Sequence, residues 1–317
     1  MIQNVVSVSL PVGENLTIKK KRITPLRGAK PDDKRISIVT GVHGDELEGQ
    51  YVCWLVQKRI NENIADLDGI VDIYPAMNPL GIDSITRGIP GFDLDMNRIF
   101  PGYSDGTMTE HIASEIISDI AGSSACIDIH ASNIYLTEVP QVRINEISRD
   151  TLIPLAKHLN VDFIWVHASA TVLESTLAYS LNEINVPTLV VEMGVGMRIT
   201  KSYCEQLADG IFSLMAELGI WKGAVSEPRT PIISRDSKVN FINAAAAGLF
   251  VPSVKHWTKL KKDDPVGMIV NPLSGAVLDN ILSPCDGILF TLREYPIVDE
   301  GSLIARILED NKEAEQQ

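Results

Sequence analysis

The sequence contains no two cysteines that lie close together. The four cysteines lie far apart and none has Cys-x-x-Cys spacing, namely Cys53, Cys126, Cys204 and Cys285. This usage is typical of isolated reduced thiols, and it excludes a disulfide framework or a zinc site built from thiolates. Long apolar runs are missing as well, and the first residues lack the basic segment and apolar run of a signal peptide. We therefore expect a cytoplasmic protein that does not contact membranes.

Positive charge is also scarce. The chain carries 28 lysines and arginines against 41 aspartates and glutamates, a formal net charge of -13. Such a charge repels phosphates, which argues against nucleic acid as a partner. The negative net charge does not indicate an acidic substrate either. A carboxylate group on the substrate would therefore have to be recognised by individual arginines. The composition, 45% hydrophobic and 22% charged, is otherwise ordinary for a globular protein.

The periodicity of apolar residues predicts an α/β fold. Short apolar runs that indicate strands lie at 35–39, 70–74, 125–130, 163–166 and 187–191, and they alternate with helical patterns at 46–60, 109–120, 151–159, 175–184 and 203–221. From about residue 225 the pattern changes to short β runs separated by turn formers. We predict a mixed, largely parallel sheet flanked by helices over residues 1–224, and a smaller all-β domain, barrel-like or sandwich-like, over residues 225–317.

A histidine and a glutamate occupy the turn after the first of these apolar strands. His43 and Glu46 lie in the segment 40–46, between a β-branched run and a helical pattern. In an open α/β sheet, such a turn lies at the carboxyl edge of the strands, where these folds bind ligands. Gly41 and Gly44 bracket the histidine, as expected where the backbone bends sharply or where another segment approaches closely. A His-x-x-Glu pair alone is common by chance, so the rest of the chain must decide.

Two further strand ends carry residues of the same kind. The run 125–130 ends at His130, and the run 187–191 is followed by Glu192, a carboxylate that needs a partner or open water. His167 also ends a strand and is a rival third metal ligand. Asp128 lies two residues before His130 and therefore on the same side of the strand. It either holds the imidazole in place or is a structural residue.

Two histidines and a carboxylate are the ligand set of a catalytic zinc site, which leaves a fourth position for water. Zinc lowers the pKa of that water, and Glu192 is placed to take its proton and pass it to a leaving nitrogen. The long loop between 75 and 102 is rich in turn formers, and one of its arginines can stabilise a developing oxyanion. Arg98 beside Asn97 offers a planar fork for a substrate carboxylate. The alternative for Arg98 is a structural salt bridge to Asp95 or Asp93.

These motifs resemble the succinylglutamate desuccinylase/aspartoacylase family, relatives of the zinc carboxypeptidases. The matching segments come in the family's order, at residues 41–46, 95–102, 128–130 and 191–194. The resemblance implies one zinc ion per chain on His43, Glu46 and His130, with Glu192 as general base and acid. It also implies that Asn97 and Arg98 bind the carboxylate end of the substrate and that Arg87 polarises the scissile carbonyl. The further arginine and tyrosines with which aspartoacylases select aspartate have no counterpart in the sequence that can be assigned.

We therefore predict a zinc-dependent amide hydrolase that removes an acyl group from an N-acylated amino acid. One alternative is a metallocarboxypeptidase that acts on peptides through the same metal site. Another is a catalytically silent metal-binding module, although the general base that such a module would lose is present as Glu192. The expected partner is a small N-acyl amino acid, and assembly into a homo-oligomer is left open.

Overall fold

The computed structural model describes residues 1–92, 94–167, 174–235 and 238–310. The first eight strands are β1 (Ile2–Ser9), β2 (Asn15–Ile23), β3 (Arg35–Thr40), β4 (Ile70–Tyr74), β5 (Ala125–Ala131), β6 (Leu136–Asn145), β7 (Phe163–His167) and β8 (Thr188–Gly194). The α-helices are α1 (Glu48–Glu62), α2 (Pro79–Ser84), α3 (Met108–Ile120), α4 (Arg149–Ala156), α5 (Leu177–Glu183) and α6 (Lys201–Glu217). Short 3-10 helices are η1 (Ile64–Asp66), η2 (Met96–Arg98), η3 (Glu146–Ser148) and η4 (Lys157–Leu159). No helix in the described part is long and apolar enough to cross a membrane.

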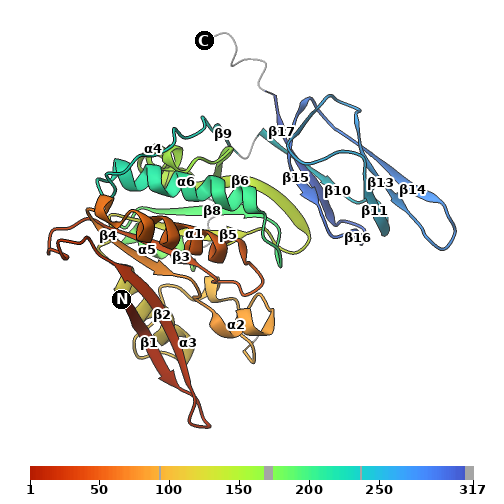
Figure 1. Cartoon of the computed structure of the whole chain (residues 1–317). Helices are drawn as coiled ribbons and strands as arrows, with labels where there is room; N and C mark the ends of the chain where they lie inside the picture. The colour runs from red at the N-terminus through yellow and green to blue at the C-terminus, as the bar shows by residue number, and fades with distance from the viewer. Residues whose placement is uncertain (93, 168–173, 236–237, 311–317) are drawn as a thin grey trace.

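The remaining strands belong to the last third of the chain. They are β9 (Ile232–Arg235), β10 (Val239–Asn243), β11 (Gly248–Pro252), β12 (Thr258–Leu260), β13 (Pro265–Val270), β14 (Val277–Leu282), β15 (Gly287–Arg293), β16 (Ile297–Val298) and β17 (Leu303–Glu309). The predicted fold class is confirmed, with a mixed sheet, flanking helices and a C-terminal antiparallel β domain (Figure 1).

The largest sheet has the strand order β1-β2-β4-β3-β5-β8-β6-β15-β17-β10. Its centre is parallel, because β3 pairs with β4 and β5, and β5 pairs with β8, all in the same direction. All seven residues of β5 are buried, as expected for a parallel strand that is covered on both faces. The carboxyl ends of β3, β5 and β8 therefore lie side by side.

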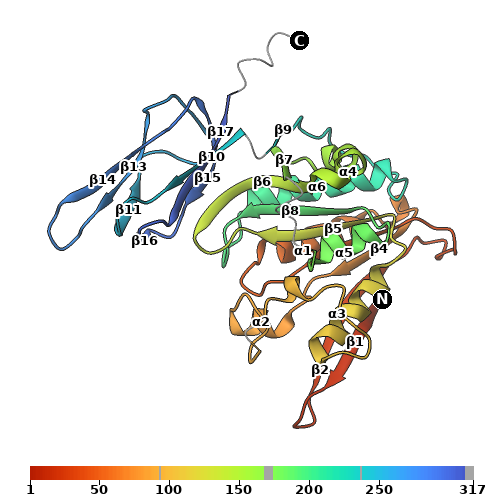
Figure 2. The same ribbon diagram turned by 180° about the vertical axis from the view of Figure 1, so that it is seen from behind.

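Helices cover both faces of this sheet (Figures 1 and 2). The first face packs against the apolar sides of α1, α4 and α6 in one core, and the opposite face packs against α3 and α5 in a second core. The first turn of α3 is secured by a capping box, in which Thr107 and Glu110 exchange side-chain and backbone hydrogen bonds. The central strands are therefore packed on both faces, and the turn 41–46 at the carboxyl end of β3 is itself buried.

The C-terminal strands have a core of their own, yet they also continue the main sheet. A second sheet, in the order β14-β13-β11-β16, packs with neighbouring strands around Phe250, Ile269 and Leu289. β15 pairs with β6, so the domain adjoins the main sheet through hydrogen-bonded strands (Figure 1). β9 lies after residue 225 and pairs with β7. The boundary at residue 225 therefore stays a prediction.

Two features differ from what the sequence indicated. The segment 136–145 was assigned no element, but it forms β6, which links the main sheet to the C-terminal strands. The segment 75–102 is not an irregular loop throughout, because it contains α2 and η2. Asn78 caps α2 by accepting a hydrogen bond from the Gly81 N–H, and Asp95 caps η2 in the same way from Asn97.

Candidate active site

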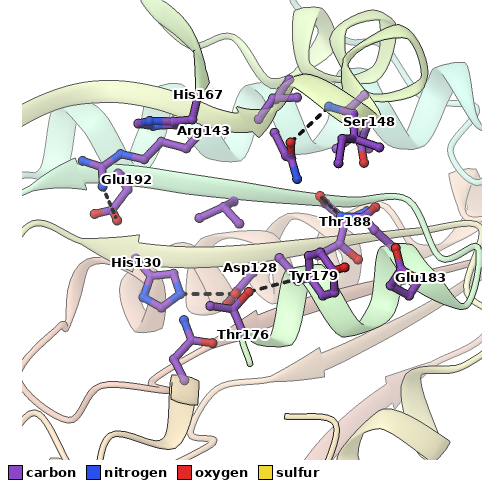
Figure 3. A pocket seen from close by; sticks show the side chains of 18 of the residues that line it. Asp128, His130, Arg143, Ser148, His167, Thr176, Tyr179, Glu183, Thr188 and Glu192 are labelled. Atoms are coloured by element: carbon purple, nitrogen blue, oxygen red, sulfur yellow. Dashed lines mark hydrogen bonds and ion pairs between the residues drawn. The ribbon is translucent and has the colours of Figure 1, made fainter. Parts of the chain in front are cut away.

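A pocket of about 370 Å³ opens at the carboxyl edge of the parallel strands and extends along β8. His43 and His130 line it together with Arg98 from the loop 75–102, and Glu192 and Arg143 stand on the strands that form its wall (Figure 3). His130 and Glu192 are direct neighbours in the register of β5 and β8. The structure thus brings six of the sequence-predicted residues into one cavity, and the seventh, Glu46, is buried beside it against both histidines; the six are His43, Arg87, Asn97, Arg98, His130 and Glu192.

The three predicted metal ligands lie within reach of a single ion. Glu46 is buried between the two imidazoles, with Oε1 2.8 Å from His43 Nδ1 and Oε2 2.9 Å from His130 Nδ1. The two Nδ1 atoms are 3.2 Å apart, and the candidate ligand atoms all lie within 4.8 Å of one another. Tetrahedral zinc with bonds of about 2.0–2.1 Å would hold two nitrogens roughly 3.3 Å apart. The spacing of the imidazoles matches that requirement.

Carboxylates behind the histidines fix which nitrogen faces the site. Asp95 Oδ1 lies 3.0 Å from His43 Nε2. Asp128 Oδ2 lies 3.2 Å from His130 Nε2, within ion-pair distance although not in the geometry of a directed hydrogen bond. A protonated Nε2 beside a carboxylate leaves Nδ1 with its lone pair, the usual orientation of metal-binding histidines. With both Nδ1 lone pairs free, the two nitrogens would face the Glu46 carboxylate across a space that suits a cation, so the residues fit a zinc ion.

The electrostatics of the group agree with this. Burial by itself disfavours the ionised form of Glu46, but His130 and His43 outweigh it and lower the pKa of Glu46 to about 2. Burial also disfavours the charged form of His130, yet Asp128 and Glu46 raise its pKa well above the ordinary value. The carboxylates therefore make the centre attractive to positive charge.

The loop 75–102 delivers its polar residues to the rim of this centre. Arg87 Nη1 lies 3.0 Å from Glu46 Oε1, and its Nη2 lies 3.4 Å from Asp95 Oδ2. Asn97 accepts the backbone N–H of Leu177 at 2.9 Å, which ties the loop to the start of α5. The structure thus places Arg87 against the ligands themselves.

Arg98 also lines the pocket, but its side chain is held by weaker contacts than that of Arg87. Its Nη1 donates to the Asn97 carbonyl at 2.7 Å and lies 3.9 Å from Asp95 Oδ2, at the limit of an ion pair. The structural salt bridge is therefore present only in a weak form, and Asp93 lies outside the described residues. The Arg98 side chain is 42% exposed, so the guanidinium of this pocket-lining residue is open to solvent.

Glu192 lies in the wall of the pocket with an arginine beside it. Arg143 Nη1 is 3.1 Å from Glu192 Oε1 (Figure 3). Burial raises the pKa of Glu192, and the charges of Arg143 and His130 oppose that rise. A raised pKa keeps a carboxylate suited to accept and return protons.

The structure also shows the surroundings of residues whose roles the sequence left open or did not indicate. His167 lines the same pocket but packs against Trp165 in a tilted arrangement, with ring centroids 4.3 Å apart, and is not part of the three-ligand group. Asp128 lies beside His130, as the first of its two readings expected. Sequence reasoning did not find Arg143 or the contact of Asp95 with His43. The one signal for Arg143 was a charge inside an otherwise β-forming run.

The two glycines that bracket His43 serve different needs. Gly41 has a φ of +69°, a conformation that residues with a side chain rarely adopt. Gly44 instead provides a close approach, because a Cβ at this position would lie 2.0 Å from the carbonyl carbon of Gly81. The turn that carries the ligands therefore rests directly on the backbone of α2.

Comparisons with known proteins agree with this architecture. A model of the succinylglutamate desuccinylase/aspartoacylase catalytic domain matches residues 32–218. The chain is 24% identical to the N-alpha-acetyl-L-2,4-diaminobutyric acid deacetylase of Halomonas elongata, over 95% of this chain and 90% of that protein.

Solved structures share the fold over almost the whole chain. A succinylglutamate desuccinylase/aspartoacylase from Rhodobacter sphaeroides superposes with a TM-score of 0.79 at 22% identity, covering 98% of this chain and 96% of that one. A product-bound ectoine utilization protein from Ruegeria pomeroyi gives a TM-score of 0.80 at 19% identity, covering 98% and 95%. Because the catalytic-domain model spans well over half of the sequence and includes every strand end of the pocket, the chain belongs to the succinylglutamate desuccinylase/aspartoacylase family.

Proposed function

We propose that this protein is a zinc-dependent amide hydrolase that removes the acyl group from an N-acylated amino acid. The observation that carries the proposal is the meeting of His43, Glu46 and His130 beside Glu192 at one pocket. The Halomonas elongata relative, named as a deacetylase of an N-acetylated diamino acid, supports the reaction class.

The ligand residues would hold the metal through His43 Nδ1, His130 Nδ1 and the Glu46 carboxylate. When bound, zinc supplies a Lewis acid that polarises the amide carbonyl and lowers the pKa of a water molecule. The Glu192 carboxylate accepts a proton from the attacking water and returns it to the leaving nitrogen. The Arg87 guanidinium stabilises the negative charge that develops on the carbonyl oxygen.

The substrate is held at the pocket opening by the loop 75–102. Arg98 binds the carboxylate of the amino acid half through its planar fork, and Asn97 helps to fix that end. The ion pairs of Arg87 with Glu46 and Asp95 hold it close to the metal ligands before substrate arrives. Placement of the groups in advance lowers the entropic cost of reaching the transition state.

A substrate screen with one pair of variants tests the proposal. The zinc-loaded protein is assayed on N-acetyl and N-succinyl amino acids beside short peptides, and we expect the acyl amino acids to be preferred. Glu192→Gln should keep zinc and fold but lower kcat by about 10²–10⁴, because an amide cannot accept the proton. Glu183→Gln, which removes another carboxylate lining the same pocket, should leave kcat nearly unchanged. Wild-type turnover by Glu192→Gln would contradict the mechanism.

The peptide-hydrolysing alternative is separated by the same screen. Among the described residues, those that line the pocket come from positions 43–192, so the C-terminal strands do not form its wall. Faster cleavage of peptides than of acyl amino acids would establish a carboxypeptidase and overturn our substrate assignment.

A further inference from the structure

Charged side chains continue from Glu192 into the protein and end in the C-terminal domain. Arg143 on β6 pairs with Glu192 through Nη1 and donates from Nη2 to Glu138 Oε1 at 3.1 Å. Arg306 on β17 donates from Nη1 to that same Glu138 oxygen at 2.7 Å. The other Glu138 oxygen accepts a hydrogen bond from Gln141. Arg306 of the C-terminal domain is thus linked to the proposed base by three contacts, through Glu138 and Arg143.

The register of three strands dictates this arrangement. Thr291 on β15 is the neighbour of Glu138 on β6 and also the neighbour of Arg306 on β17. Adjacent strands lie about 4.8 Å apart, so the backbones at 138 and 306 are separated by roughly 10 Å. Only a long side chain spans that gap, and it passes Thr291, which is completely buried. The bridge therefore depends on the pairing of β6 with β15.

Burial makes the bridge costly to leave incomplete. The Glu138 side chain is 1% exposed, and Trp165 lies 5.6 Å from the Arg143 guanidinium and 5.5 Å from that of Arg306. The negative charges of Glu138 and Glu192 balance the positive charges of Arg143 and Arg306. Removal of either carboxylate would therefore leave an arginine charge uncompensated. Without Arg306, the full charge of Glu138 would act on Arg143 alone and draw it away from Glu192.

We infer that Arg143 is a positioning residue for Glu192, and that Arg306 of the C-terminal domain holds Arg143 in place through Glu138. The inference rests on the proposed role of Glu192 as base and acid. The C-terminal domain then contributes to turnover through a side chain that does not line the pocket. Arg143 sets where the Glu192 carboxylate stands relative to the attacking water, while the binding of substrate is left to the loop 75–102.

Kinetics of single variants provide the first test. Arg306→Gln should lower kcat roughly tenfold and Arg143→Gln up to about 100-fold, a part of what a positioned acid–base group contributes. KM and zinc content should stay near wild type, and Arg143→Lys should recover part of kcat because it keeps the charge without the planar fork. The matched control is Arg293→Gln on β15, whose guanidinium, among the described residues, donates to the backbone carbonyls of Tyr295, Ile297 and Leu303. A main effect on KM would make Arg143 a substrate-binding residue and overturn the inference.

A second readout is independent of turnover. The arginine Nε–H signal of Arg143, assigned by its loss in Arg143→Lys, should shift in NMR spectra of Arg306→Gln and of Glu192→Gln, but not of Arg293→Gln. An unchanged signal in Arg306→Gln would refute the coupling. If Arg306→Gln does not fold, the double variant with Glu138→Gln removes both buried charges together and is measured for the same loss of kcat.

A double-mutant cycle separates this inference from the proposed function. In a Glu192→Gln background, Arg306→Gln should cause no further loss of kcat, because both changes act on one group. Additive losses would show that Arg306 acts elsewhere and overturn the inference alone. Full activity of Glu192→Gln by itself would instead overturn the proposed function.

Discussion

The charge of Asp128 is expected to strengthen zinc binding through His130. Asp128 is fully buried on β5, and its Oδ2 lies 3.2 Å from His130 Nε2. Asp128→Asn keeps an oxygen of similar size beside Nε2, but the negative charge that makes Nδ1 more basic is lost. Removal of such a partner typically weakens metal affinity by about 10- to 100-fold, and the retained acceptor places our expectation near tenfold, or about 1.4 kcal/mol.

Competition between the protein and a chromophoric chelator measures this change directly. The zinc Kd is determined at one pH for wild type and for Asp128→Asn, with thermal unfolding recorded with and without zinc. The control is Asp72→Asn, which removes another fully buried aspartate, on β4, that does not contact the ligand group. Unchanged zinc affinity in Asp128→Asn, or an equal loss in Asp72→Asn, would refute the orienting role of Asp128.

Three further predictions concern the ligand set, the carboxylate and the fold. Metal analysis should find the site emptied in His130→Ala and filled in His167→Ala; the reverse would mean that the wrong strand end was chosen. Wild-type protein should prefer free-acid substrates over their methyl esters, and Arg98→Ala should lose that preference. The expected coupling energy between Arg98 and the substrate carboxylate is about 1.5–3 kcal/mol. An equal preference in both proteins would show that Arg98 does not bind the carboxylate. Asp72→Asn should cost about 3–5 kcal/mol of unfolding free energy near neutral pH, because it leaves Lys20, Arg22 and Arg35 without their shared partner. Burial raises the pKa of Asp72 but the three cations lower it below the unfolded value, so urea titrations should show the difference shrinking as pH falls below about 4.

Much of the fold was predictable because its centre follows simple rules. The strands around His43 and His130 are short apolar runs, and parallel strands bring their carboxyl ends together whatever their separation in sequence. The register of β5 and β8, which makes His130 and Glu192 neighbours, is a direct expression of this rule. The gathering of the candidate residues was therefore accessible from sequence, while their roles stay predictions.

The strand β6 was not predictable for a physical reason. It buries Glu138 and Gln141, contains Pro140 and the half-buried Arg143, and these residues interrupt the apolar pattern that would otherwise indicate a strand. Its charges are tolerated because Arg306, far along the chain, completes their pairing. The contact of Asp95 with His43 is equally non-local and depends on the path of the loop 75–102. Pairings of this kind leave no periodic signal in the sequence.

The close contact between Gly44 and Gly81 limits how this enzyme can be redesigned by loop grafting. The metal-ligand turn and α2 meet backbone to backbone, and the Gly44 N–H also donates to the Arg87 carbonyl at 3.3 Å. If the segment 75–102 is exchanged for that of a relative, any graft that displaces α2 would press on the turn that carries His43. Such a graft must therefore preserve the backbone contact between positions 44 and 81. Mutant libraries aimed at new substrates are better confined to the part of the segment 75–102 that follows α2.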